Sequence, residues 1–100
     1  MNSINMKIIN INGEVMLAAA DSELLNRELR EGKLHLNVKP EFYGEMKVSE
    51  ETFISSLGIC TIANLVGERV INAAINASYI DPENIIKING VPHAQLAKIV

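Results

Sequence analysis

Two Asn-Gly dipeptides, one near each end of the chain, constrain its fold more than any other feature. Asn-Gly readily adopts the left-handed backbone of a two-residue β-turn, so β-rich sequence on both sides of it predicts a hairpin. The expected strands are Lys7–Ile11 and Glu14–Ala18 around Asn12-Gly13, and Ile85–Ile88 and Leu96–Val100 around Asn89-Gly90. We therefore expect one hairpin at each end. The intervening Val91–Gln95 is expected to be a loop, because proline cannot donate to a central ladder.

A helix and a strand are expected after the first hairpin. Asp21 or Ser22 is a good N-cap for a helix that extends to about Glu31 and ends at Gly32. The alternation in Leu34–Val38 then predicts a strand, whose leucines and valine face the core and whose His35 faces solvent. Pro40 ends this strand, and the segment 41–44 is expected to be a turn or loop before Met46–Val48.

The longest apolar periodicity lies between Ser49 and Ser78, where residues recur at helical spacing. Gly58 is expected to divide this region into a short helix and a long one. The apolar residues of 59–77 predict a central core helix, with Thr61, Asn64 and further amides on its opposite side. Together these elements predict an α+β fold in one domain, residues 1–100: a largely antiparallel sheet built from N- and C-terminal hairpins, packed on a central helical segment.

Composition excludes several classes of function. A single cysteine, Cys60, allows neither an internal disulfide nor a multi-cysteine zinc site, and its apolar neighbours predict a buried, inert thiol. No apolar run approaches the length of a membrane span, so a cytoplasmic location is expected. The net charge of −3 argues against non-specific binding of free DNA or other free nucleic acid. Basic residues nevertheless concentrate between Arg27 and Lys47, interleaved with glutamates that favour a solvated, salt-bridged face.

No catalytic residue, metal ligand or cofactor is predicted. Nucleophile-elbow, Walker and dinucleotide-binding motifs are missing, and two histidines with one cysteine lack a ligand spacing. His93 has no visible catalytic partner, so it is expected to shape its loop, which still offers a contact surface. Phe42 is expected either to contact a partner together with Tyr43, or to anchor its loop while Tyr43 covers it.

The candidate contact residues share exposure, charge or amide chemistry in the expected loops and basic region. They are Arg27, Arg30, Lys33, Lys39, Phe42, Tyr43, Lys47, Asn64, Arg69, His93 and Gln95.

Five segments in sequence resemble the archaeal domain-of-unknown-function family 424. They are Asp21–Leu25, Arg30–Leu34, Glu41–Gly44, Thr61–Gly67 and Gly90–Gln95, within a similarity from about Met6 to Ile99. The resemblance implies an archaeal cytoplasmic α+β protein of this size and brings no established activity. It also suggests an association with translation, so the partners it implies are ribosomal RNA and ribosomal or translation-factor proteins.

Three functional hypotheses follow. The first is a non-enzymatic ribosome- or translation-associated binding protein, with Arg27, Arg30, Lys33 and Lys39 facing RNA. The second is a small enzyme or ligand-binding domain, whose pocket requires His93, Tyr43 and the amides of Asn64 and Asn72 to converge. The third is an obligate homodimer that pairs through exposed hairpin edges.

Overall fold

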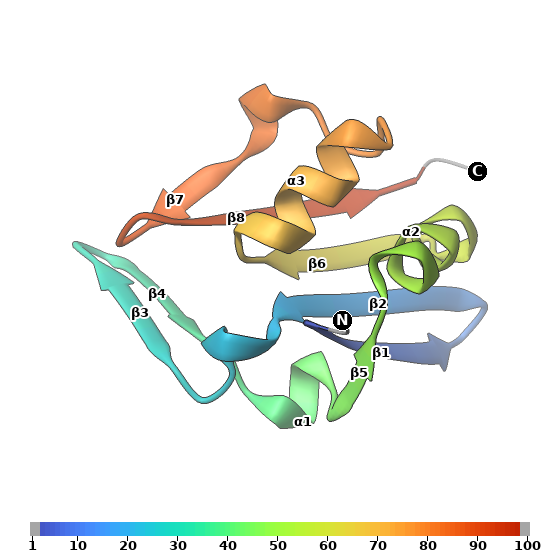
Figure 1. The fold of residues 1–100 in the computed structure, drawn as a ribbon, viewed down its shortest axis with the longest axis horizontal. Helices are drawn as coiled ribbons and strands as arrows, with labels where there is room; N and C mark the ends of the chain where they lie inside the picture. The colour runs from blue at the N-terminus through green and yellow to red at the C-terminus, as the bar shows by residue number, and fades with distance from the viewer. Residues whose placement is uncertain (1–2, 99–100) are drawn as a thin grey trace.

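A computed structural model describes residues 3–98 of the chain, folded as a six-stranded sheet beside a separate two-stranded ribbon (Figure 1). The sheet has the strand order β5-β1-β2-β6-β8-β7, and β3 and β4 form the ribbon. The strands are β1 (Ile4–Ile11), β2 (Glu14–Asp21), β3 (Glu28–Glu31), β4 (Leu34–Asn37), β5 (Met46–Val48), β6 (Ile62–Val66), β7 (Ile86–Ile88) and β8 (Val91–Ala97). The helices are α1 (Pro40–Tyr43), α2 (Glu50–Ile59) and α3 (Glu68–Asn76), with 3-10 turns at Ser22–Leu24 and Pro82–Asn84.

Both predicted Asn-Gly turns are confirmed, and each closes a terminal hairpin. In each, the Asn-Gly pair has positive φ angles, 50° and 84° for Asn12 and Gly13 and 53° and 81° for Asn89 and Gly90. These angles match the right-handed twist of the flanking strands, as in a type I′ turn. The α+β class and the largely antiparallel sheet are confirmed as well; the neighbours β2 and β6 pair in parallel.

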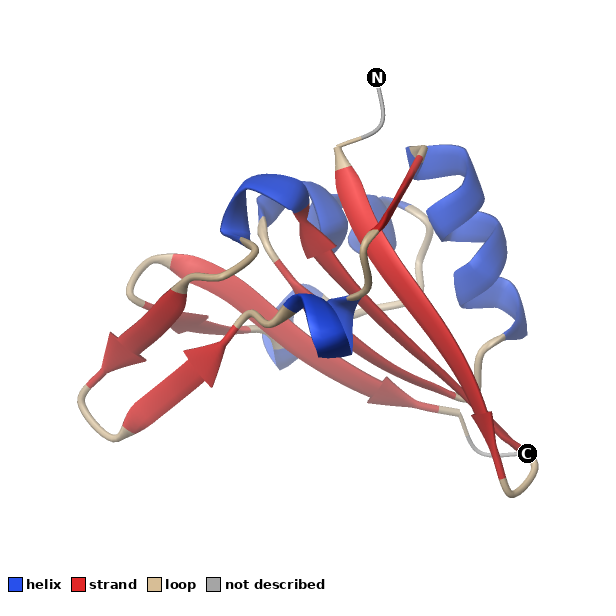
Figure 2. Ribbon diagram, turned by 90° about the horizontal axis from the view of Figure 1, so that it is seen from below, coloured by secondary structure: helices blue, strands red, loops and turns tan. Residues whose placement is uncertain are grey.

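The two faces of the sheet are covered differently. Helices α2 and α3 pack on one face, where Phe53 and Leu57 of α2 and Val70 of α3 meet the sheet residues Leu17 and Leu65 in the main core. The short helix α1 and the β3–β4 ribbon pack on the other face around a second core (Figures 1 and 2). That second cover is partial, so part of this face stays open at Ile62 and Gln95.

The central helix predicted over 59–77 is wrong. α2 ends at Ile59, one residue after Gly58; β6 crosses the middle of the sheet, and only then does α3 begin. Ile59, expected in the core, is 67% exposed. Apolar residues stand on both faces of β6: Ala63 and Leu65 are buried in the main core, Val66 is buried in the second core, and Ile62 lies on the open part of that second face. The strand therefore does not show the period of two that marks a half-buried strand.

The helix predicted over 21–31 is also wrong. A single 3-10 turn follows β2, and the rest of the segment becomes β3, which pairs with β4 from Glu28↔Asn37 to Glu31↔Leu34. Gly32, expected as a helix C-cap, instead begins the turn of this ribbon with φ 61°. The strand predicted over 34–38 is confirmed, but Leu34 at its start is 43% exposed and does not face the core.

The predicted loop at 91–95 is wrong, because β8 runs straight through it. Pro92 is tolerated within β8 because the β6–β8 ladder ends at Val66↔His93. Pro92 lies just beyond that end, where no ladder hydrogen bond requires a backbone N–H. Its carbonyl still accepts the N–H of Gly67 at 2.9 Å. The returning strand predicted over 96–100 overlaps β8 at its start, and residues 99–100 lie outside the described part of the chain.

No helix within residues 3–98 combines the length and apolar character required to cross a membrane.

Candidate binding site

Three side chains from separate elements meet on the helix-poor face of the sheet. The Tyr43 hydroxyl at the end of α1 donates to Oδ1 of Asn64 on β6 at 2.7 Å. His93 on β8 places Nε2 3.2 Å from the same oxygen. Tyr43 is 1% exposed, while Asn64 and His93 are half-buried. The convergence required by the ligand-binding hypothesis is therefore present for these three residues.

Protonation states in this cluster are set by burial. Burial raises the pKa of Tyr43 to about 12, so its hydroxyl keeps its proton and donates. Burial lowers the pKa of His93 below its ordinary value, so the ring is neutral near pH 7. A neutral ring that donates through Nε2 leaves Nδ1 as an acceptor, and this atom is buried without a hydrogen-bond partner among residues 3–98.

The Asn64 amide is consequently oriented. Its oxygen accepts both internal bonds, so its NH₂ group is the part left to bond another molecule. A hydrogen-bond donor held in one orientation suits the recognition of a ligand. Proton transfer by Tyr43 is poorly served, because its pKa of about 12 lies far from a neutral working range.

Asn64 lines a groove of about 430 Å³ on the open part of this face. Its cross-strand neighbour Gln95 is exposed at the groove, and Phe42 of α1, 37% exposed, lies at its side. None of the lining residues is charged, and the others are Met16, Ile62, Ala63, Leu96 and Ala97. The predicted role of Phe42 as loop anchor is therefore wrong: Tyr43 is the buried anchor and Phe42 is the exposed ring.

A second, polar groove of about 410 Å³ lies at the base of the β3–β4 ribbon, between the ribbon and α1. Arg27 and Lys39 line it, and neither forms an ion pair within residues 3–98. The other lining residues are Asn26, Glu28, Asn37, Val38, Pro40 and Glu41. Oδ1 of Asn37 is buried there without a partner in the described part of the chain.

Four predicted contact residues thus belong to the ribbon, which projects from the body of the protein (Figures 1 and 2). Arg30 lies on β3 and Lys33 in the ribbon turn, with Arg27 and Lys39 at its base. Glu28 holds Arg30 at 3.4 Å and the exposed His35 at 2.9 Å. Both hydrogen bonds lower the pKa of Glu28, and the one from His35 has the larger effect.

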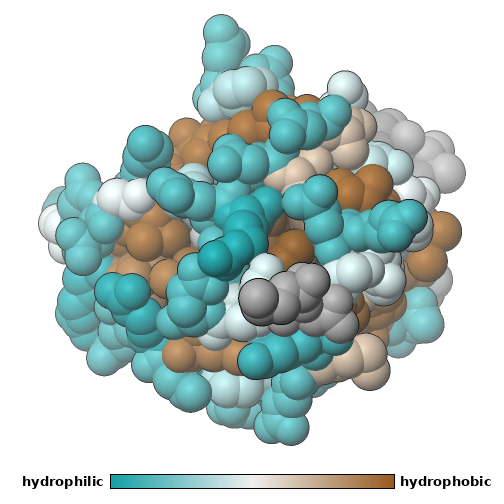
Figure 3. Space-filling view, in the orientation of Figure 1, coloured by the Kyte–Doolittle hydropathy of each residue, from teal (hydrophilic) through white to brown (hydrophobic). Residues whose placement is uncertain are grey.

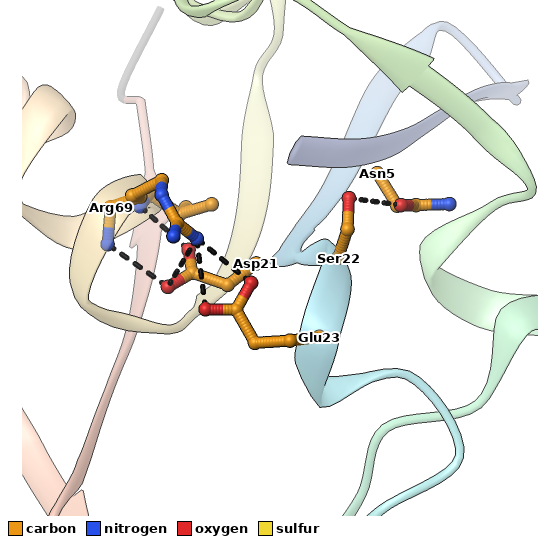
Figure 4. Close-up of polar contacts among 6 residues, drawn as sticks. Asn5, Asp21, Ser22, Glu23 and Arg69 are labelled. Carbon is orange, nitrogen blue, oxygen red and sulfur yellow. Dashed lines mark hydrogen bonds and ion pairs between the residues drawn. The ribbon is translucent and has the colours of Figure 1, made fainter. Parts of the chain in front are cut away.

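Two predicted contact residues belong neither to the ribbon nor to the groove and polar cluster around Asn64. Lys47 is exposed on the edge strand β5. Arg69 binds both carboxylate oxygens of Glu23, at 2.8 and 2.9 Å, and lies 3.8 Å from Asp21, so its charge is neutralised within the protein (Figure 4). Asn72 is also absent from the cluster, because α3 covers the opposite face of the sheet.

Asp21 caps α3 from a distant part of the chain. Its carboxylate accepts the backbone N–H of Arg69 at 3.1 Å and of Val70 at 3.0 Å (Figure 4). Burial raises the pKa of Asp21, against the lowering effect of these two hydrogen bonds and of the Arg69 charge. The N-terminus of α3 is therefore already occupied by a carboxylate of the protein itself and offers no free anion site.

The remaining reactive groups do not form a site. Cys60 is buried as predicted, at the C-cap of α2, and burial raises the pKa of its thiol. Within residues 3–98, no group of three or more histidine, cysteine or acidic side chains is placed to hold a metal ion.

Sequence reasoning missed the apolar lining of the uncharged groove. Ile62 and Ala97 are cross-strand partners, as are Asn64 and Gln95, so each pair shares one face. The alternation of Val91, His93, Gln95 and Ala97 along β8 carries this signal. Among residues 3–98, eight large apolar side chains are exposed, and hydrophobic atoms are visible between hydrophilic ones in Figure 3.

The fold and the grooves define a small α+β domain with oriented amide groups on an open sheet face and a projecting basic ribbon. The chain belongs to the family described as Protein of unknown function (DUF424), whose model matches residues 9–99, in agreement with the resemblance seen in the sequence. A crystal structure of an uncharacterized conserved protein from Methanopyrus kandleri has a similar fold, with a TM-score of 0.77 and 22% sequence identity over 93% of this chain and 89% of that one. A comparison with curated proteins gives no significant match.

Proposed function

We propose that this protein is a non-enzymatic binding protein of the archaeal translation apparatus, which contacts RNA through the β3–β4 ribbon and docks beside ribosomal or translation-factor proteins. The proposal relies on the distribution of charge.

Segregation of positive charge onto the ribbon is the observation that carries this proposal. Residues 27–39 contain four basic and two acidic side chains, a net charge of +2. The remainder of the chain contains five basic and ten acidic side chains, a net charge of −5. An acidic protein with one projecting basic ribbon can place that ribbon against phosphates while the rest faces solvent or protein.

The polar groove at the ribbon base gives this charge a defined position. Arg27 and Lys39 are its cations, and Glu28 and Glu41 are its acids. Glu28 is engaged with Arg30 and His35. Asn26 and Asn37 supply amide groups beside the two cations. Arginine, lysine and amide side chains are the usual ligands of phosphate and sugar oxygens.

Sedimentation of a native archaeal lysate on a gradient at moderate salt tests the association. The protein is expected to travel with ribosomal subunits, and recovery only at the top of the gradient would count against the proposal. Recovery with subunits that resists ribonuclease would assign the contact to ribosomal proteins.

A charge-matched pair of variants tests the role of the ribbon. Arg27→Gln with Lys39→Gln removes both groove cations, whereas Lys47→Gln with Lys87→Gln removes two exposed cations elsewhere. The slope of log affinity for a short single-stranded RNA against log salt is expected to fall by roughly 1.4 in the first variant, at about 0.7 for each phosphate contact. Equal slopes in both variants would contradict a specific role for the ribbon.

Binding of a small ligand near His93 is the second candidate function, since Tyr43, Asn64 and His93 converge beside the uncharged groove. Its enzymatic form has weaker support, because no nucleophile lines that groove. Shifts of the Asn64 and Gln95 amide signals by small metabolites in an NMR titration, with no response to RNA, would favour it over the RNA proposal.

Homodimerisation is supported by one edge of the sheet. β5 pairs only with Ile4–Met6 of β1, which leaves the uncharged segment Ile8–Ile11 without a neighbour on that side in the described part of the chain. Uncharged edge strands readily pair with another chain. Light scattering that shows a monomer at micromolar concentration would exclude the obligate dimer.

A further inference from the structure

We propose that the uncharged groove beside Asn64 binds one unpaired base of a single-stranded RNA, with the base against Phe42 and its polar edge at Asn64 and Gln95. This inference rests on the proposed RNA-binding function and specifies how the sheet face takes part in it.

The groove has the chemistry of a base site. A nucleobase presents a flat π-face and a polar edge, and proteins bind unpaired bases by stacking on an aromatic ring and by hydrogen bonds to that edge. Phe42 supplies an exposed ring, while Asn64 and Gln95, directly opposite each other on β6 and β8, supply two neighbouring amides. Its volume of about 430 Å³ lies within the usual range of about 300–1,000 Å³ for small-molecule sites.

The two partly buried hydrogen bonds to its oxygen make Asn64 a selective donor. Because Tyr43 and His93 occupy its oxygen, Asn64 offers N–H groups to the groove and favours a base edge with an acceptor. A freely rotating surface amide would present either end. The amide is thus oriented before the ligand arrives, which reduces the entropic cost of binding.

Charge assigns the base and the phosphate to different grooves. No charged residue lines the groove beside Asn64, so it cannot neutralise a phosphate. Arg27 and Lys39 line the polar groove, and Lys39 directly precedes α1, the helix that carries Phe42. A strand that passes along α1 can therefore place a phosphate at Lys39 and an unstacked base at Phe42. A duplex cannot do this, because its bases remain stacked and paired.

Two substitutions separate this groove from the ribbon. Asn64→Asp keeps an acceptor for both Tyr43 and His93 but replaces the donor that faces the groove by a carboxylate oxygen, and Asn72→Asp on α3 is its charge-matched control. Phe42→Ala removes the ring, and Met46→Ala, at an apolar side chain that is 68% exposed outside the groove, is the matched truncation. Thermal unfolding establishes that each variant is folded.

Fluorescence anisotropy with a labelled single-stranded RNA of mixed sequence measures the effect. Phe42→Ala is expected to weaken RNA binding about tenfold, in the range of one lost base–aromatic stack, and to leave the salt slope unchanged. Asn64→Asp is also expected to weaken RNA binding about tenfold, because it replaces the donor that faces the base. Met46→Ala and Asn72→Asp should bind like the unmodified protein, and a duplex should bind more weakly than the single strand.

Other outcomes overturn the inference in distinguishable ways. If both groove variants bind RNA normally while Arg27→Gln with Lys39→Gln binds weakly, RNA binding stands and the base site is refuted. If the groove variants bind RNA normally but leave the ribosomal subunits in a gradient, the groove takes a protein segment. If a free mononucleotide binds as tightly as the RNA, the ligand is a small molecule. If the unmodified protein binds no RNA, the proposed function and the base site both fail.

Discussion

Replacement of Gly67 by alanine tests how Asp21 joins the first hairpin to α3. Gly67 precedes α3 with φ 111° and ψ 153°, a region that is nearly exclusive to glycine. An added Cβ would fall against the Asp21 carboxyl group, 2.6 Å from Oδ1 and 2.7 Å from Oδ2. These oxygens accept the first free N–H groups of α3, so the Cβ must displace the cap as well as strain the backbone.

The expected cost follows from these two contributions. The unfavourable φ and ψ angles cost about 1–2 kcal/mol, and loss of the capping hydrogen bonds costs about 1–2 kcal/mol more. We therefore expect Gly67→Ala to lower the free energy of unfolding by about 3 kcal/mol, out of a typical total of about 5–15 kcal/mol. Gly13→Ala is the control, because Gly13 also has a positive φ, 84°, but its added Cβ meets nothing within 4 Å. It should cost only about 1 kcal/mol.

Urea denaturation measures both variants, and a double-mutant cycle isolates the contact. In an Asp21→Ala background the carboxylate is gone, so Gly67→Ala should lose the part of its cost that arises from displacing the cap. If Gly67→Ala costs no more than Gly13→Ala, or costs the same with and without Asp21, the cap does not hold α3 as described.

Other substitutions test the hydrogen bonds that hold α1, α2 and β8. Tyr43→Phe removes the donor to Asn64 and should lower the free energy of unfolding by about 1 kcal/mol in urea titrations, with the groove otherwise intact. Ser49→Ala removes the oxygen that accepts the Thr52 N–H at the N-cap of α2 and should cost about 1 kcal/mol, a loss that Ser49→Asp should largely avoid. Because burial lowers the pKa of folded His93 below 6.5, the unfolded chain binds more protons as pH falls, so stability should decrease below about pH 6.5. His93→Gln should flatten this dependence between pH 7 and pH 5, and an unchanged slope would contradict the buried, neutral ring.

The features predictable from the sequence are those encoded in a few adjacent residues. Asn12-Gly13 and Asn89-Gly90 fix both the turn and its register, because both central residues of such a turn need a positive φ. The N-cap of α2 is encoded equally locally, since the Ser49 side chain accepts the N–H of Thr52, three residues further on. Burial of Cys60 followed from its apolar neighbours and is confirmed as well.

The features that were not predictable depend on tertiary partners. β6 pairs with β2 in parallel and with β8, and both partners lie far from it in the sequence. It carries apolar residues on both faces, which removes the alternation that marks a half-buried strand. Likewise, the leucines at 24, 25 and 29 fit a helical stripe, yet Leu29 is buried on β3 against the second core. A short apolar run does not distinguish these alternatives without knowledge of its neighbours.

The strand conformation of Ile62–Val66, a segment predicted to be helical, also explains why Tyr43, Asn64 and His93 form a polar cluster. On a helix, Asn64 would have lain on a solvated face and needed no partner. On β6 it lies in the central part of the sheet, where an unpaired amide costs about 1–3 kcal/mol. Tyr43 and His93 satisfy its oxygen, so their main effect is to fix this amide, and Asn64 itself becomes the group most able to contact a ligand. Asn64 is thus a polar residue within the apolar pattern of a central strand, and the donors Tyr43 and His93 support it. This is the kind of local conflict that functional sites retain.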